Sequence, residues 1–228
     1  MLSTKNFGFF QSGAPNFILY GVEAAVPTLS ALLVTMLLGG RKGIAAFLRK
    51  LYVNNIKIQY IISAIIIPMA ILTATKLSLL LFENNAHFFS DISSRKLIII
   101  LWALIAEEIG WRGFLQERIS EKFGYIATPL FVGSIWALWH YHFFWTGAMS
   151  APIPLFALGC IAESYGYCWV TTKSKGNIIP ASVWHFTSNL FINLFAIDPL
   201  YNDGSVLPYL LYVGFTLLMA VILVIRKY

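Results

Sequence analysis

Residues 97–112 read LIIILWALIAEEIGWR, an apolar run that ends in two adjacent carboxylates and an arginine. The run has the composition of a membrane-spanning helix, where each ionisable residue costs roughly 2.5–3.5 kcal/mol on insertion scales. Ionisable residues that persist there usually mark a functional site. We therefore expect a membrane protein with a polar centre buried among its helices.

The whole chain has the composition of an integral membrane protein. Its 228 residues are 58% hydrophobic and only 11% charged, whereas soluble domains are about 25% charged. The net charge of +6 comes from residues that lie between apolar runs, which argues against a nucleic-acid-binding face. The expected partners are the lipid bilayer and a substrate, with no nucleic acid.

Seven apolar stretches of spanning length follow one another along the chain. They cover residues 15–39, 58–82, 97–116, 126–146, 152–172, 178–197 and 206–225. Glycine, proline and charged residues separate them, as expected of turns between helices. We predict an all-α membrane bundle of about seven transmembrane helices that forms a single domain over residues 1–228.

The lysines and arginines orient this bundle, because short cytoplasmic loops hold an excess of both. One set of alternating loops contains eleven of them: Arg41, Lys42, Arg49, Lys50, Lys57, Arg118, Lys122, Lys173, Lys175, Arg226 and Lys227. The opposite set contains Lys5, Arg95 and Lys96. This bias predicts an N-terminus outside and a C-terminus in the cytoplasm, in what we expect to be a prokaryotic plasma membrane.

The first cytoplasmic loop carries an apolar stripe with helical spacing. The stripe consists of Ile44, Phe47, Leu48, Leu51 and Tyr52. This pattern predicts an amphipathic helix in the cytoplasmic interface, against anionic lipid. A connecting helix packed on the bundle would show the same pattern.

The charged motif offers two roles for its carboxylates. In a helix, Glu108 and Arg112 are four residues apart and share a face, which predicts a structural ion pair. Glu107 projects about 100° away from Glu108 and has no partner on its own helix. A buried carboxylate left in this way suits a general base.

Two later apolar segments add polar side chains that would complete such a site. His185 and Asn189 are four residues apart, so an imidazole and a carboxamide point the same way and could stabilise an oxyanion. His140 lies on the preceding segments. With Glu107 these residues form a set able to activate water for amide hydrolysis. The alternative is that they only hydrogen-bond helices together.

Other ionisable residues stand outside that set. We expect Glu163 to line the same cavity or to pair with a lysine, and Lys76 to reach the interface or to pair with Glu23. His142 follows His140 by two residues, so it should face nearly the opposite side and serve packing.

These motifs resemble the signature of the CAAX-protease and bacteriocin-processing (CPBP, or Abi) intramembrane endopeptidases, which is EExxxR, then FxxxH, then HxxxN or HxxxD. The first and third motifs are present. In the second, Trp136 stands four residues before the histidine, where the family has phenylalanine. The resemblance covers roughly residues 97–197, which we expect to be the catalytic core.

The resemblance implies an endopeptidase that cleaves a membrane-associated or lipidated peptide or protein in a cavity open to the cytoplasm. Glu107 and His140 would activate water, and His185 with Asn189 would stabilise the oxyanion. Glu108 and Arg112 would hold the helix geometry.

The need for a metal stays open at this point. Members of the family have been described both as metalloproteases and as metal-independent glutamate-type enzymes. Glu107, His140 and His185 are ligand types that could hold a divalent metal such as zinc, and a site without metal fits the spacing equally well.

Two other classes of protein remain as alternatives. In a proton- or ion-coupled transporter, the intramembrane acids and histidines would form a relay. In a non-catalytic bacteriocin immunity protein, they would serve structure only. The chain lacks HExxH, GxSxG and GxxxxGK[ST], so zincin, serine-hydrolase and P-loop functions lose their usual support.

Overall fold

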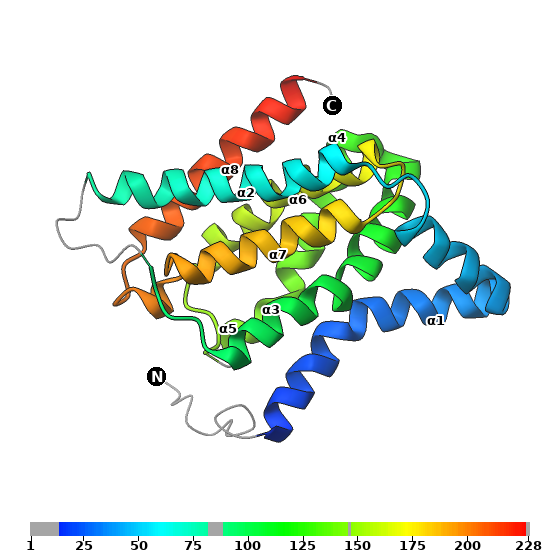
Figure 1. Ribbon diagram of the computed structural model, residues 1–228, viewed down its shortest axis with the longest axis horizontal. Coiled ribbons are helices and arrows are strands. Elements are labelled where there is room, and N and C mark those ends of the chain that lie inside the picture. The colour runs from blue at the N-terminus through cyan, green and yellow to red at the C-terminus, as the bar shows by residue number, and fades with distance from the viewer. Residues whose placement is uncertain (1–13, 82–88, 146, 227–228) are drawn as a thin grey trace.

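The computed structural model describes residues 14–81, 89–145 and 147–226, with side chains from Gly21 onward, and its regular elements are all helices (Figure 1). In chain order they are α1 (Ala14–Tyr52), α2 (Ile58–Leu79), α3 (Ser94–Ala106), η3 (Ile109–Leu115), α4 (Gln116–Trp139), α5 (Tyr141–Trp145), α6 (Ile153–Lys173), α7 (Ile179–Leu194), η4 (Pro199–Tyr201) and α8 (Leu207–Ile225). The predicted all-α bundle is confirmed.

Four helices are long and apolar enough to cross a membrane: Gly21–Tyr52 within α1, and α2, α6 and α8. The other three expected spans correspond to helices that are shorter or interrupted. The range 97–116 breaks at Glu107, the range 126–146 is interrupted where α4 ends at Trp139, and α7 has only 16 residues. The structure thus shows a multi-pass membrane protein with four clear spans.

The predicted amphipathic helix is present as the second part of α1. The helix bends at Gly40, whose φ of 60° lies in the left-handed region that glycine adopts without strain. Beyond the bend, residues 41–52 turn their apolar stripe toward the protein. Leu51 is fully buried in an apolar cluster, and the ring of Phe47 meets that of Phe114 edge-on at 6.3 Å. The stripe therefore covers the bundle itself.

Three polar segments meet at one end of the bundle, which we call the cationic end: residues 49–57, 116–122 and 173–178. Hydrogen bonds tie them together: Ile178 N to Leu51 O (2.9 Å), Lys57 Nζ to Lys173 O (2.7 Å) and Asn177 Nδ2 to Asn54 O (2.8 Å). Lys50 also forms an ion pair with Glu117. The end is therefore closed by direct contacts between loops.

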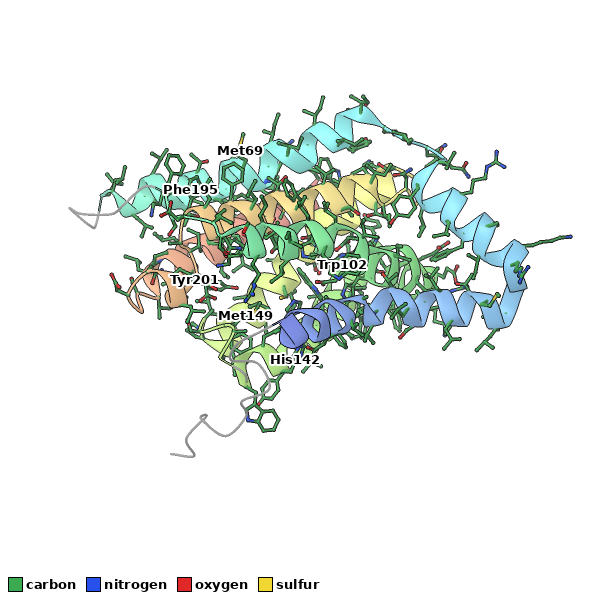
Figure 2. All side chains as sticks on the ribbon, turned by 60° about the horizontal axis from the view of Figure 1, so that its bottom comes forward. Met69, Trp102, His142, Met149, Phe195 and Tyr201 are labelled. Carbon is green, nitrogen blue, oxygen red and sulfur yellow. The ribbon has the colours of Figure 1, made fainter. Side chains whose placement is uncertain are left out.

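The opposite end, which we call the cavity end, is made of residues 89–96, 147–152 and 194–206. Its contacts are Ser90 N to Leu194 O (2.7 Å), Ser150 Oγ to Asp198 Oδ1 (3.0 Å), and Lys96 Nζ over the Tyr201 ring (3.3 Å). In Figure 2, Met149 and Tyr201 lie at this end, away from the bend of α1. All polar loops described by the structure thus gather at two separate ends.

The core lies around α6, which packs against α4, α7 and α8. The indole of Trp184, on α7, is fully buried and occupies the space that a side chain at Gly166 would need. A larger residue at position 166 would push α7 away from α6. This close contact fixes the position of the helix that carries His185.

Candidate active site

The charged motif lies where an α-helix gives way to a π-helix. α3 ends at Ala106, Glu107 follows as its C-terminal cap, and η3 spans Ile109–Leu115. Such turns are rare and frequently occur at functional sites. The expected span 97–116 is therefore divided into two helices at Glu107. η3 packs closely on α1, since a Cβ at Gly110 would overlap the main chain of Pro27.

Glu108 joins two of the predicted motifs. Its Oε1 accepts hydrogen bonds from Arg112 Nη1 at 3.3 Å and from His185 Nδ1 at 2.9 Å, and all three side chains are buried. The Arg112 guanidinium also stacks on Trp136 (4.5 Å) and Tyr167 (3.9 Å). The predicted ion pair is confirmed, and it also anchors the imidazole of α7.

Trp136 connects Glu107 to both histidines. Its indole Nε1 donates a hydrogen bond to Glu107 Oε2 at 3.2 Å. The ring centroids of His140 and His185 lie 5.4 and 5.8 Å from that of Trp136, both edge-on. The sequence analysis noted Trp136 only as a replacement for the phenylalanine of the family, so the donor function was missed. The signal was available, because an indole has an N–H that the phenylalanine of the family lacks.

The two imidazoles are held in the same way. His140 Nδ1 lies 2.8 Å from the Trp136 carbonyl oxygen, and His185 Nδ1 lies 2.9 Å from Glu108 Oε1. A carbonyl oxygen and a carboxylate only accept, so Nδ1 carries the proton in both rings. This leaves Nε2 of each ring for other partners.

A cavity of about 300 Å³ brings the candidate residues together. Its inner part is lined by Glu107, Trp136, His140, Glu163, His185 and Asn189. All four residues predicted to be catalytic therefore face one space, although they come from the α3–η3 junction, the end of α4, and α7. A substrate and a water molecule could meet them there together.

The cavity extends to the loops of the cavity end, where Lys96, Met149 and Tyr201 line it. Burial of the Lys96 amino group lowers its pKa to about 8, against the opposing effect of the Asp198 charge. We expected both the mouth and the cationic loops on the cytoplasmic side. The structure places them at opposite ends of the bundle, so these two expectations exclude each other.

Glu163 forms a second buried carboxylate centre on α6. It accepts hydrogen bonds from Trp184 Nε1 (2.6 Å), Tyr212 OH (2.9 Å) and Ser188 Oγ (3.4 Å). Trp184 and Ser188 directly precede His185 and Asn189 in the sequence. Glu163 lines the cavity, which was one of the two alternatives expected for it. Its hydrogen bonds also hold α7 beside His185 and Asn189.

The remaining intramembrane charges have other partners than expected. Glu23 Oε1 lies 2.9 Å from His142 Nε2, so the proposed partner Lys76 is wrong. Lys76 is buried and donates to the Phe195 carbonyl oxygen at 3.1 Å. His142 points away from the cavity, as its offset from His140 predicted. Lys5 and Lys227 lie outside the described residues.

The candidate metal ligands do not lie close enough together to form a metal site. Among the residues that the structure describes, no three histidine, cysteine, aspartate or glutamate side chains are grouped closely enough to hold an ion. Glu107, His140 and His185 thus share a cavity without forming a ligand cluster, and we derive no step through a metal.

The structure thus defines a membrane protein with a polar site inside its helical bundle. The site combines carboxylates, histidines and an asparagine around one cavity. The family can be stated as well. Residues 91–191 match the family model described as type II CAAX prenyl endopeptidase, Rce1-like. Over this segment the chain is similar to that family, and the recognition made from its motifs is confirmed.

A curated relative supports the same assignment. The chain is 24% identical over 169 residues to CAAX prenyl protease 2 of Methanococcus maripaludis. The match covers 66% of this chain and 60% of that relative. The family segment contains every motif residue from Glu107 to Asn189.

Proposed function

We propose that this chain is an intramembrane endopeptidase that hydrolyses a peptide bond in a protein or peptide at the membrane. Its family supports a protease, and the polar cavity supports chemistry within the membrane. We further propose that α3 with η3, α4 and α7 complete a bundle of seven crossings, with a single domain and a cytoplasmic C-terminus in a plasma membrane.

In this proposal Glu107 is the general base and His140 helps to position the attacking water. The water oxygen attacks the scissile carbonyl carbon, and its proton passes to Glu107. The same proton is then transferred to the nitrogen of the leaving amine as the C–N bond breaks. No other reactant is needed, so atoms and protons balance.

His185 and Asn189 are proposed to donate hydrogen bonds to the oxyanion. His185 would donate through Nε2 in its imidazolium form, because its Nδ1 already donates to Glu108. The Glu108 carboxylate favours that cation, and Arg112 keeps the carboxylate in place. Preorganised donors of this kind account for a large part of catalysis by many enzymes.

One observation supports this choice of base above all. Of the three glutamates buried in the described part of the chain, Glu108 and Glu163 are each held by two or more donor residues. Glu107 and Glu163 both line the cavity, but Glu107 accepts from one donor residue, Trp136. It is therefore the carboxylate that is placed to receive a proton from a molecule in the cavity.

The test is cleavage by the purified protein in detergent of a pooled library of quenched fluorescent peptides, prenylated and plain. Glu107→Gln keeps the size of the side chain while removing the base. Cleavage that is lost in this variant supports the proposal, and a chelator arm reports on metal dependence. Equal cleavage by both proteins would overturn the role of Glu107.

A further inference from the structure

The cationic end of the bundle contains a second cavity, of about 260 Å³. Its wall comes from the end of α1, from η3 with the start of α4, and from the end of α6 with the turn that follows. Among the described residues, this cavity has no lining residue in common with the catalytic cavity. It is therefore a separate feature of the fold, and the proposed reaction makes no use of its space.

The second cavity combines an exposed rim with a buried polar floor. Ser120 and Lys175, at the rim, are exposed to solvent. Arg112 and Gln116, which form the floor, are 1% and 6% exposed. A molecule that enters from the polar end of the bundle would therefore meet a guanidinium and a carboxamide inside.

One edge of the Arg112 guanidinium has no partner in the protein. Its Nη1 donates to Glu108 Oε1 at 3.3 Å, and the rings of Trp136 and Tyr167 pack against the group. Nε and Nη2 are buried, and neither has a hydrogen-bond partner within the part of the chain that the structure describes. These two N–H groups form a planar fork that fits two oxygens of one phosphate or carboxylate. Because a buried donor without a partner is costly, the fork favours such an acceptor.

The charges around the second cavity also favour an anion. Lys50, Arg112 and Lys175 line it, and the carboxylate among its lining residues is Glu117, which pairs with Lys50. The Lys50 side chain lies close to the backbone of Gly176, where a Cβ would come within 2.8 Å of Lys50 Cε. The lining groups thus carry a positive excess, which attracts a negatively charged ligand.

We propose that the second cavity binds a phosphate group, with the Nε–Nη2 edge of Arg112 at the floor and Lys175 at the rim as its cationic partners. Phosphate fits better than carboxylate because it has oxygens for further donors, which Gln116 and Ser120 supply. Two sources carry this group: a phosphate compound in solution, and the headgroup of an anionic phospholipid, since basic pockets between membrane helices bind such headgroups.

The ligand would leave the structural ion pair intact. It uses the N–H groups on Nε and Nη2, whereas Glu108 is held through Nη1. The proposed site is also independent of the protease function, because its occupancy is measured without any cleavage. Failure of one proposal therefore leaves the other standing.

The first test measures thermal unfolding of the purified protein in detergent as sodium phosphate replaces sodium chloride at constant ionic strength. A ligand that binds the folded form raises Tm in a saturable way. Lys175→Gln should weaken the apparent affinity for phosphate about tenfold, the effect of losing one hydrogen bond between charged groups. Lys122→Gln is the matched control, since Lys122 is an exposed lysine of the same end that does not line the cavity, and it should bind like the wild type.

A second pair of variants adds a negative charge in place of removing a positive one. Thr172→Glu places a carboxylate at the exposed rim and should abolish the phosphate-dependent rise in Tm. Ala46→Glu adds the same charge at an exposed position of α1 outside the cavity and should keep the rise. The Tm without phosphate shows that each variant is folded.

The lipid arm uses native mass spectrometry of the protein mixed with dioleoyl phosphatidylglycerol or with dioleoyl phosphatidylcholine. Saturable binding of either phosphate or phosphatidylglycerol that Lys175→Gln and Thr172→Glu weaken, and that their controls keep, supports the proposal, and the probe that binds identifies the source. Binding of neither probe would overturn it, as would binding that all four variants keep equally.

Discussion

Two carboxylate centres contact α7, and they differ in how many donors they hold. On α6, Glu163 is surrounded by an indole, a phenol and a hydroxyl. At the junction of α3 and η3, Glu108 accepts from Arg112 and His185, whereas its neighbour Glu107 accepts from one indole. Glu163 also lines the cavity, so the comparison teaches that neither burial nor a place on the cavity wall identifies a reactive carboxylate, whereas a small number of hydrogen-bond donors does.

The largest effect on the cleavage rate is expected from removing the proposed base, Glu107. Glu107→Gln should lower kcat by about 10²–10⁴-fold, the usual contribution of a general base. Initial rates of peptide cleavage by purified protein give the value. If the variant keeps more than a tenth of the wild-type rate, Glu107 does not differ from Glu108 and Glu163 as proposed.

The ion pair of Glu108 and Arg112, next to Glu107, should instead determine the stability of the fold. Arg112→Met leaves the buried Glu108 carboxylate without its ion-pair partner, so we expect the free energy of unfolding to fall by about 3–5 kcal/mol. Unfolding by detergent titration measures it. Arg118→Met, on the exposed side of α4, is the control and should change the value by about 0.5 kcal/mol or less. Equal effects would contradict the ion pair.

The proposed oxyanion donor can be separated from its neighbour on the same helix. Asn189→Ala should lower kcat by about 10²–10³-fold, because a preorganised donor to the oxyanion is lost. Asn193 also lines the cavity, but its side chain donates to the Asn189 carbonyl oxygen. Asn193→Ala is therefore expected to keep most of the activity, and the opposite order would count against the assignment.

Trp136 offers a smaller change that sharpens the comparison at Glu107. Trp136→Phe restores the family's residue and removes the hydrogen bond to Glu107. We expect kcat/KM to fall by about ten- to a hundredfold, as one hydrogen bond to a charged group contributes roughly 1.5–3 kcal/mol. Trp139→Phe, three residues on, should have little effect. If both variants cleave like the wild type, the indole does not position Glu107.

The smallest effect on catalysis is expected at the second centre. Glu163→Gln keeps one acceptor oxygen but replaces the other with an amide that cannot accept from Trp184, Tyr212 and Ser188 together. The free energy of unfolding should fall by about 1–3 kcal/mol. Cleavage rates should stay within about tenfold, because the carboxylate touches no reacting atom in the proposed reaction. A change in stability near zero would show that the three hydrogen bonds contribute little.

The sequence predicted most of the candidate site, because ionisable residues inside apolar stretches stand out. Helical spacing alone predicted the Glu108–Arg112 pair and the shared face of His185 and Asn189. Helix ends were less predictable. The break at Glu107 and the close contact of Gly110 with a distant part of α1 were not predicted, because apolar periodicity contains no signal for either.

The partners of Glu163 could not be predicted for a related reason. Its donors lie 21 to 49 residues away on α7 and α8, so no local spacing points to them. The cavity mouth and the cationic loops were both expected on the cytoplasmic side, because the family resemblance and the charge bias were applied separately. Only the fold relates the two.

The central claim is that Glu107 serves chemistry while Glu163 serves structure, and one paired measurement tests it. Initial cleavage rates and the free energy of unfolding are measured side by side for the wild type, Glu107→Gln and Glu163→Gln on the same peptide. The account predicts a crossed result, with activity lost and stability kept in the first variant, and activity kept and stability lowered in the second. Parallel losses of activity and stability in both variants would contradict it.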